Sequence, residues 1–356
     1  FSGSGKSTLA LVIAQLYRYT QGSVQMDGQE VKDMAKGDLA VNMGMVAQDP
    51  FIFDGTVREN ILYSCEAMRM HGGGGCGKDG ELPDLDKLIE VVQQVGIFLD
   101  VLRFGLRTVL DRERNADLVE SIIRTRQNFQ EQSEDLLEDI EFFDPDRFLD
   151  YSSIALNIVF GAPGGKATGL ETLHENEEFL AFCEAEGITD QLLELGRRIV
   201  LRSVDIIASA GEDPELFEQT PIPRLDFPEF RKLSETLEGR DLTSFGDEER
   251  AMLLKTALDF TPGAHRVLGI DDAFRDKVLT ARKRFFQVMD EREGGHFVRF
   301  SQDDYLGSQS IQDNILFGHI KADSAGAEER INQRIMQLLI LEGVLEPVVE
   351  MGMDFQ

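Results

Sequence analysis

The first eight residues, FSGSGKST, have the residue types and spacing of a phosphate-binding loop. In such a loop, a glycine-rich turn directs backbone N–H groups and the positive end of the following helix toward phosphate oxygens. A lysine and a hydroxyl-held Mg²⁺ then complement the phosphate charge, and Lys6 and Ser7 stand at these two positions. The expected binding residues are Ser2, Gly3, Ser4, Gly5, Lys6, Ser7 and Thr8. They predict that the chain binds the phosphates of a nucleotide.

A loop of this kind is normally held between a buried strand and a helix. Residues 6–18 carry apolar side chains almost all round, which predicts a buried helix directly after the loop. The strand, and the first glycine of the G-x-x-x-x-G-K-[ST] pattern, would precede Phe1. We therefore expect this sequence to be part of a longer protein.

Three local signals follow the loop. The segment GSVQMDGQEV predicts a β-hairpin, because Asp27 and Gly28 form a preferred two-residue turn between short apolar runs. Residues 41–47 predict a buried strand by their length and composition. Thr56 precedes a helical pattern with Glu59 three residues later, which is the spacing of a capping box.

Residues 1–63 resemble the ATP-binding subunit of an exporter-type ABC transporter. Three motifs occur in that family's order: the phosphate-binding loop, the GSVQMDGQEV hairpin and a glutamine loop, VAQDPFIFDGTVRENI. The resemblance implies ATP and Mg²⁺ as ligands, with Lys6 at the β- and γ-phosphates and Ser7 on the metal. It also implies that Gln48 reaches both Mg²⁺ and the attacking water, since an amide offers a carbonyl acceptor and N–H donors. Ser7 and Gln48 are then the metal ligands, and Gln48 is a catalytic residue.

The same resemblance implies two protein partners. A second ATP-binding domain would complete a dimer around ATP, and a transmembrane domain would be driven by its closure at the cytoplasmic face of the membrane. The apolar residues 50–53 would form part of the groove for a coupling helix, although they could equally belong to the core. The net charge of −29 argues against a nucleic acid as partner.

An internal repeat provides a second catalytic candidate. Its three copies contain the related segments TVRENILY at Thr56, SIALNIVFG at Ser153 and SIQDNILFG at Ser310. Gln302 precedes the asparagine of the third copy by the same interval that separates Gln48 from the first, whereas the middle copy has FFDPDRFLDY there. The sequence leaves open whether Gln48 or Gln302 serves the active site.

The fold class that follows is a partial α/β P-loop NTPase with a large, mainly α-helical insertion. From residue 84 onward most segments are acidic amphipathic helices. We expect a partial ATP-binding domain over residues 1–111, an acidic helical insertion with an eroded repeat over 112–299, and a third glutamine-loop-like copy over 300–356.

The predicted function is ATP binding within the nucleotide-binding subunit of an ABC transporter, where binding and hydrolysis drive export. These residues contain neither the signature loop nor a Walker B strand, an apolar strand ending in Asp-Glu, so we expect no hydrolysis by this chain alone. Two alternatives remain. One is a degenerate nucleotide-binding regulatory module, and the other is a soluble P-loop kinase or ATPase.

Overall fold

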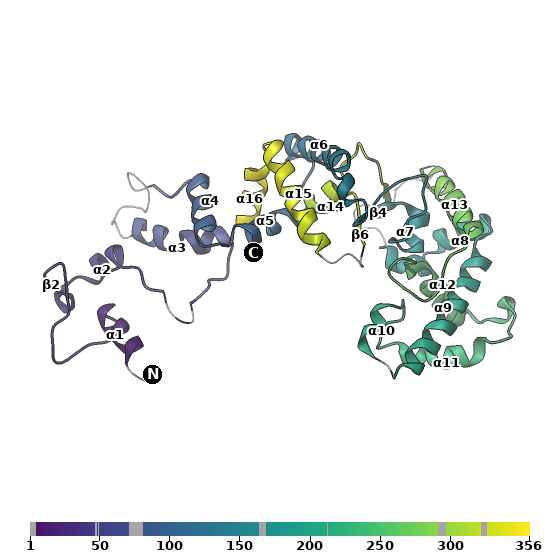
Figure 1. The fold of residues 1–356 in the computed structure, drawn as a ribbon, viewed down its shortest axis with the longest axis horizontal. Coiled ribbons are helices and arrows are strands. Elements are labelled where there is room, and N and C mark those ends of the chain that lie inside the picture. Colours follow the sequence, from purple (N-terminus) through teal and green to yellow (C-terminus); the bar gives the residue numbers. More distant parts are fainter. Residues whose placement is uncertain are drawn as a thin grey trace. The chain divides into compact units, whose positions relative to one another are not determined.

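The computed structural model of this chain describes residues 5–46, 48, 50–70, 81–163, 169–211, 213–290, 297–321 and 326–356. The chain divides into two compact units, which Figure 1 shows as a ribbon. The first unit comprises Phe1–Gly105 and Pro347–Gln356, and the second comprises Leu106–Glu346. The three-part division expected from the sequence stays a prediction.

The first unit is mainly helical. Its one described sheet is a hairpin, as predicted: Gln25 pairs with Glu30, and Asp27 and Gly28 have φ of 50° and 80°. Both φ values lie in the left-handed region that a type I′ turn requires. The described helices and strands of this unit are α1 (Lys6–Ile13), β1 (Gln25–Met26), β2 (Gln29–Glu30), α2 (Lys36–Asn42), α3 (Val57–Met70), α4 (Leu85–Gln94), α5 (Phe98–Leu106) and α16 (Leu345–Met353).

Two predictions for this unit were wrong. The expected buried helix over residues 6–18 forms only as the shorter α1, which has no buried residue. The expected strand over residues 41–47 is absent from its described part, because α2 extends to Asn42 and residues 43–46 form no regular structure. A strand needs neighbouring strands to satisfy its backbone N–H and C=O groups, and the described part of this unit offers only the small hairpin.

Helices α5 and α16 cross at two glycines. A Cβ atom placed on Gly105 would lie 1.9 Å from the carbonyl oxygen of Val348, and one on Gly352 would lie 1.9 Å from that of Val101. Only glycine permits this approach of two backbones, so the contact depends on both residues. Beside it, the rings of Phe104 and Phe355 stack with centroids 4.9 Å apart.

The second unit is also helical and contains two small antiparallel sheets. Its main hydrophobic cluster lies around α7, α9, α12 and α13, and Gly196 of α9 packs directly on the backbone of Leu253 in α12. The described helices and strands are α6 (Ala116–Gln132), β3 (Ile140–Phe142), α7 (Ile154–Val159), β4 (Gly161–Pro163), α8 (Glu177–Ala185), α9 (Thr189–Ser209), α10 (Pro214–Glu218), α11 (Phe227–Leu237), α12 (Asp247–Asp259), α13 (Asp272–Asp290), β5 (Phe297–Arg299), α14 (Ile311–Leu316), β6 (Gly318–Ile320) and α15 (Ala327–Leu341).

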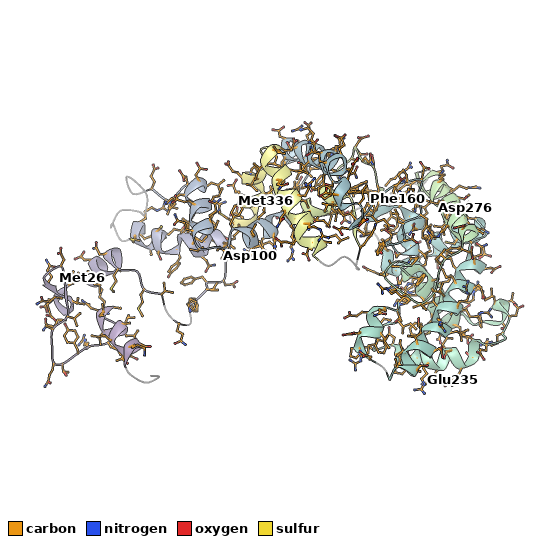
Figure 2. All side chains as sticks on the ribbon, viewed as in Figure 1. Met26, Asp100, Phe160, Glu235, Asp276 and Met336 are labelled. Atoms are coloured by element: carbon orange, nitrogen blue, oxygen red, sulfur yellow. The ribbon has the colours of Figure 1, made fainter. Side chains whose placement is uncertain are left out.

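The two sheets join the second and third repeat copies reciprocally. Strand β3 precedes the second repeat segment, which begins at Ser153, and pairs with β6, which follows the third segment, which begins at Ser310. Strand β5 precedes the third segment and pairs with β4, which follows the second. The ring of Phe143 stacks on that of Phe300 with centroids 4.4 Å apart. Phe160, labelled in Figure 2, packs edge-to-face against the Phe300 ring with centroids 5.5 Å apart. The two copies therefore share one aromatic cluster.

The helical part of the predicted fold class agrees with the described residues. Every sheet in them has two antiparallel strands, so the parallel sheet of a P-loop domain is not among them. Within the same residues, no helix combines the length and the apolar character that crossing a bilayer requires.

Candidate functional site

The predicted phosphate-binding loop leads into the first turn of α1. Gly5 is the N-cap residue and has φ of 79°, a conformation that glycine adopts without strain. Lys6, Ser7 and Thr8 follow in the first turn and are exposed. The other predicted binding residues, Ser2, Gly3 and Ser4, lie outside the described residues.

This helix end has the donor set that a phosphate group needs. The first N–H groups of a helix have no partner within the helix and carry partial positive charge. The first turn of α1 contains no acidic residue, so nothing there repels an anion, and Lys6 adds a full positive charge. Ser7 provides a hydroxyl that can ligate Mg²⁺ beside the phosphates. The residues therefore fit a magnesium–nucleotide.

The two glutamine candidates belong to different units. Gln48 lies in the first unit with Lys6, its side chain is exposed, and the structure gives no hydrogen bond from it to residues 5–8. Gln302 lies in the second unit, where its backbone carbonyl accepts from Nη1 of Arg126 at 3.0 Å. The backbone carbonyl of Gln302 thus takes part in a structural hydrogen bond that the sequence pattern did not predict.

The segment after Gln48 forms a tight turn closed by Asn60. The Asn60 Oδ1 accepts from the Phe53 N–H at 2.8 Å, and its Nδ2 donates to the carbonyls of Phe53 and Thr56, both at 3.0 Å. The predicted capping box is confirmed: the Glu59 N–H donates to Thr56 Oγ1 and the Thr56 N–H donates to Glu59 Oε2. The apolar tip before the turn is exposed, and Phe51 is 79% accessible.

The second and third copies repeat this turn in buried form. Asn157 Oδ1 accepts from the Leu149 N–H at 2.9 Å, and Asn314 Oδ1 accepts from the Leu306 N–H at 2.8 Å. Each asparagine is fully buried and donates from Nδ2 to three backbone carbonyls. We call these structures the first, second and third Asn turns, closed by Asn60, Asn157 and Asn314.

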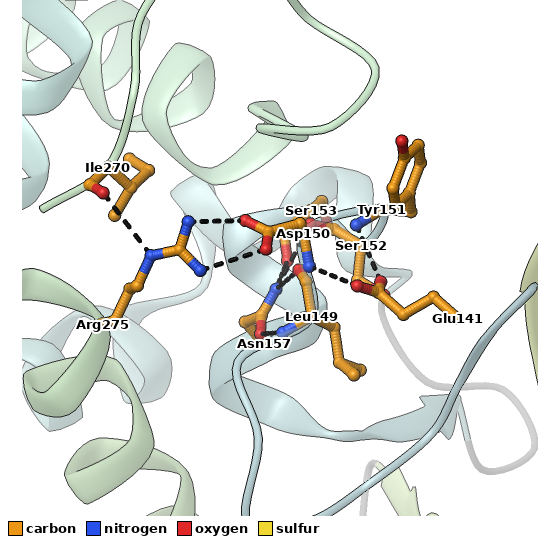
Figure 3. A network of polar contacts seen from close by, with 9 residues as sticks. All are labelled: Glu141, Leu149, Asp150, Tyr151, Ser152, Ser153, Asn157, Ile270 and Arg275. Atoms are coloured by element: carbon orange, nitrogen blue, oxygen red, sulfur yellow. Dashed lines mark hydrogen bonds and ion pairs between the residues drawn. The ribbon is translucent and has the colours of Figure 1, made fainter. Parts of the chain in front are cut away.

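Figure 3 shows the surroundings of the second Asn turn. The Glu141 carboxylate accepts from the N–H groups of Asp150 and Tyr151 at 2.8 and 2.7 Å, and burial raises its pKa. Arg275 forms a two-pronged ion pair with Asp150 at 2.8 and 3.1 Å. These contacts hold the loop before Asn157 in place.

Each of the two Asn turns of the second unit binds its own buried arginine. In the third Asn turn, Arg126 of α6 donates from Nε to the backbone carbonyl of Asn314 at 2.6 Å and from Nη2 to the Asn314 Oδ1 at 2.8 Å. In the second turn, Arg282 of α13 donates to the same atoms of Asn157 at 2.7 and 2.8 Å. Each arginine also donates from Nη1 to three loop carbonyls, which belong to Ser301, Gln302 and Asp304 in one turn and to Asp144, Pro145 and Arg147 in the other.

These arginines were not anticipated from the sequence, although a signal exists. Each stands in an Arg-x-x-Phe segment, RQNF at Arg126 and RKRF at Arg282, and the phenylalanines Phe129 and Phe285 are buried. Desolvation lowers the pKa of both guanidinium groups to about 10, which leaves them charged at neutral pH. Each cation also lies over an aromatic ring, Phe317 or Phe160, at 4.4 and 4.6 Å.

The first part of the chain is similar to known proteins. Residues 1–151 match the family model described as ABC transporter. Similar proteins include ABC transporter B family member 2 of Dictyostelium discoideum and the uncharacterized ABC transporter ATP-binding protein YwjA of Bacillus subtilis, each 45% identical over 62 residues. A putative multidrug export ATP-binding/permease protein of Staphylococcus aureus is 46% identical over 61 residues. No solved structure matches the chain.

These matches cover short segments of long proteins. Each match covers 17% of this chain. It covers 4% of the Dictyostelium protein and 11% of each of the two bacterial proteins.

Proposed function

We propose that residues 2–8 hold the phosphates of ATP, from the premise that residues 1–151 match the ABC transporter family model. The observation that carries the proposal is the start of α1, where Gly5 takes the left-handed conformation directly before Lys6 and Ser7. Backbone N–H groups at a helix start point at phosphate oxygens, and a lysine beside them adds a full positive charge.

Each residue has a distinct task in this site. The Lys6 ammonium lies beside the β- and γ-phosphates, and the Ser7 hydroxyl holds Mg²⁺. The metal, when bound, neutralises charge on the phosphate oxygens. Gln48 orients a water molecule and reaches the metal from its exposed position on the loop before the first Asn turn. Gln302 is the second candidate for this task.

We propose that ATP binding by this chain serves export across a membrane. One relative is a putative multidrug export ATP-binding/permease protein, and residues 1–63 carry exporter-type motifs. The exposed tip with Phe51 and Ile52 suits contact with a transmembrane domain at the cytoplasmic face of a membrane. A second ATP-binding domain completes the site as a dimer. These residues alone bind ATP without turnover, because phosphoryl transfer needs additional charged groups around the nucleophile.

Binding of ATP by the Lys6→Ala variant tests the proposal. Titration calorimetry with Mg²⁺ and ATP is expected to show at least about tenfold weaker binding, since a charge-assisted contact to phosphate is lost. The matched control is Lys32→Ala, which removes an exposed lysine of the same unit outside the loop. Equal ATP affinity of Lys6→Ala and the unsubstituted chain would overturn the assignment.

A further inference from the structure

A cavity of about 490 Å³ lies in the second unit, lined by residues of α6, of β3 and of the loop that leads into the second Asn turn. Gln302 and Lys321, from the segments on either side of the third Asn turn, complete the lining. Figure 3 shows two further lining residues, Glu141 and Asp150. A volume of this size is typical of a site for a small molecule. We call it the β3 cavity.

The polar lining of the β3 cavity is not a requirement of the repeat. Arg126 of α6 and Arg282 of α13 bind equivalent atoms of the two Asn turns, so residues at equal distances from them correspond. Gln130 stands four positions after Arg126 and lines the cavity. Its counterpart after Arg282 is Phe286, which is buried in the hydrophobic core and reaches Gly161.

Two more lining positions differ between the halves in the same way. Strand pairing places Val298 of β5 at the position that Glu141 occupies in β3. The carbonyls that accept from the two arginines place Pro145 at the position of Gln302. At all three positions, one half of the unit has a polar side chain and the other half has an apolar one. Because the repeat folds with either set, the polar set is available to bind a ligand.

Several hydrogen-bond donors of the lining have no partner in the part of the chain that the structure describes. The Nε2 of Gln130 is buried without a hydrogen bond. The side chains of Gln302 and Arg147 are exposed, and their printed bonds to described residues come from the backbone alone. The Nζ of Lys321 donates to the Leu137 carbonyl at 2.9 Å, which uses one of its three N–H groups. A ligand with several oxygen acceptors satisfies these donors.

The charges of the lining cancel. Asp150 forms an ion pair with Arg275. The remaining charged residues of the lining are two acids and two bases, Glu141, Asp144, Arg147 and Lys321. An ion bound there would lose its hydration without gaining a net counter-charge, and an anion would in addition meet a chain whose net charge is −29. The lining therefore favours a neutral ligand.

We propose that the β3 cavity binds a sugar. Sugar hydroxyl groups are neutral and both donate and accept, so they can accept from the amides of Gln130 and Gln302 and donate to the second lone pairs of the Glu141 carboxylate. The apolar C–H faces of the sugar ring pack against Phe142 and Phe148, which also line the cavity. The site contains no residue of the phosphate-binding loop, so it is independent of the proposed ATP function.

Saturation-transfer difference NMR of the full chain tests the proposal with three hexoses as probes, D-glucose, D-galactose and D-mannose. At least one is expected to bind saturably with a dissociation constant of roughly 1–10 mM, the range for a ligand of about a dozen non-hydrogen atoms. Absence of saturable transfer to all three hexoses would overturn the proposal. Saturable binding of acetate without any hexose would overturn the assignment to a neutral ligand.

Variants of the chain locate the binding site. Gln302→Ala and Lys321→Met each remove a donor from the lining and are expected to weaken hexose binding at least about fivefold. Gln130→Leu keeps a similar volume and removes no side-chain hydrogen bond to the described residues, so it keeps the test valid if Lys321→Met disturbs the loop at Leu137. Undiminished binding by all three variants would place the sugar elsewhere and refute the assignment.

Two control variants separate this site from other effects. Lys232→Met removes an exposed lysine of the same unit that does not line the cavity, and hexose binding is expected to be unchanged. Lys6→Ala is also expected to leave hexose binding unchanged, whatever its effect on ATP. A loss of hexose binding in either control equal to that in Lys321→Met would contradict the assignment to the β3 cavity.

Discussion

Replacing Arg126 by methionine tests the central structural claim about the second unit. Methionine fills a similar volume but donates no hydrogen bond, so the carbonyl of Asn314 loses the bond from the guanidinium and its Oδ1 keeps only the bond from the Leu306 N–H. Asn314 is fully buried, and water cannot replace the guanidinium there without opening the turn.

The magnitude follows from two opposing terms. Five hydrogen bonds from a charged donor, at about 1.5 kcal/mol each, favour the arginine by roughly 7 kcal/mol. Burial of the cation opposes them: it lowers the pKa of Arg126 from 12.5 to about 10, which corresponds to roughly 3 kcal/mol. Arg126→Met is therefore expected to lower the free energy of unfolding by about 4 kcal/mol.

Urea unfolding followed by circular dichroism measures the effect. Arg282→Met is the internal control, because its five bonds and its pKa match those of Arg126, and the two losses are expected to agree within about 1 kcal/mol. Arg126→Lys is expected to lose about half as much, since three donors cannot reach all five acceptors. A loss below about 1 kcal/mol for Arg126→Met would refute the claim that the arginine holds the turn.

Two further predictions concern pH and packing. Burial lowers the pKa of His265 to about 4, so the unfolded chain takes up the proton first as pH falls from about 6.5. Its contribution to stability is complete above pH 7, and about 2 kcal/mol is expected to be lost by pH 5. His265→Gln is expected to reduce this loss in urea titrations at both pH values, and an unchanged pH dependence would contradict the reasoning. Gly196→Ala places a Cβ 2.1 Å from the Leu253 carbonyl oxygen and is expected to cost about 3 kcal/mol, whereas Gly269→Ala meets no atom within 4 Å and is expected to change stability by less than about 0.5 kcal/mol. Thermal unfolding of the two alanine variants checks this, and equal midpoints would show that the α9–α12 crossing can adjust.

Short-range signals were predicted correctly from the sequence. The Asp27-Gly28 hairpin and the Thr56–Glu59 capping box form as expected, because their hydrogen bonds join residues within a few positions of each other. The repeated Asn-Ile segments were also recognised, since each asparagine bonds to its own preceding loop. The family assignment rests on the same local motifs and agrees with the comparisons.

Structure that depends on distant partners was not predictable in this way. The strand expected over residues 41–47 lacks neighbours among the described residues, and α2 occupies its first part. Arg126 lies 188 residues before Asn314, and Arg282 lies 125 residues after Asn157. No pattern along the chain connects these pairs, because only folding brings the arginine helices onto the turns.

The sequence by itself thus determined the motifs that match the ABC transporter family, the Asp27-Gly28 turn and the Thr56–Glu59 cap, and the existence of three related segments. Tertiary structure alone decided that two of those segments enclose a buried arginine and share an aromatic cluster. The physical reason is that turns and caps are stabilised by backbone hydrogen bonds within a few residues, whereas burial of a charge requires acceptors gathered from several elements.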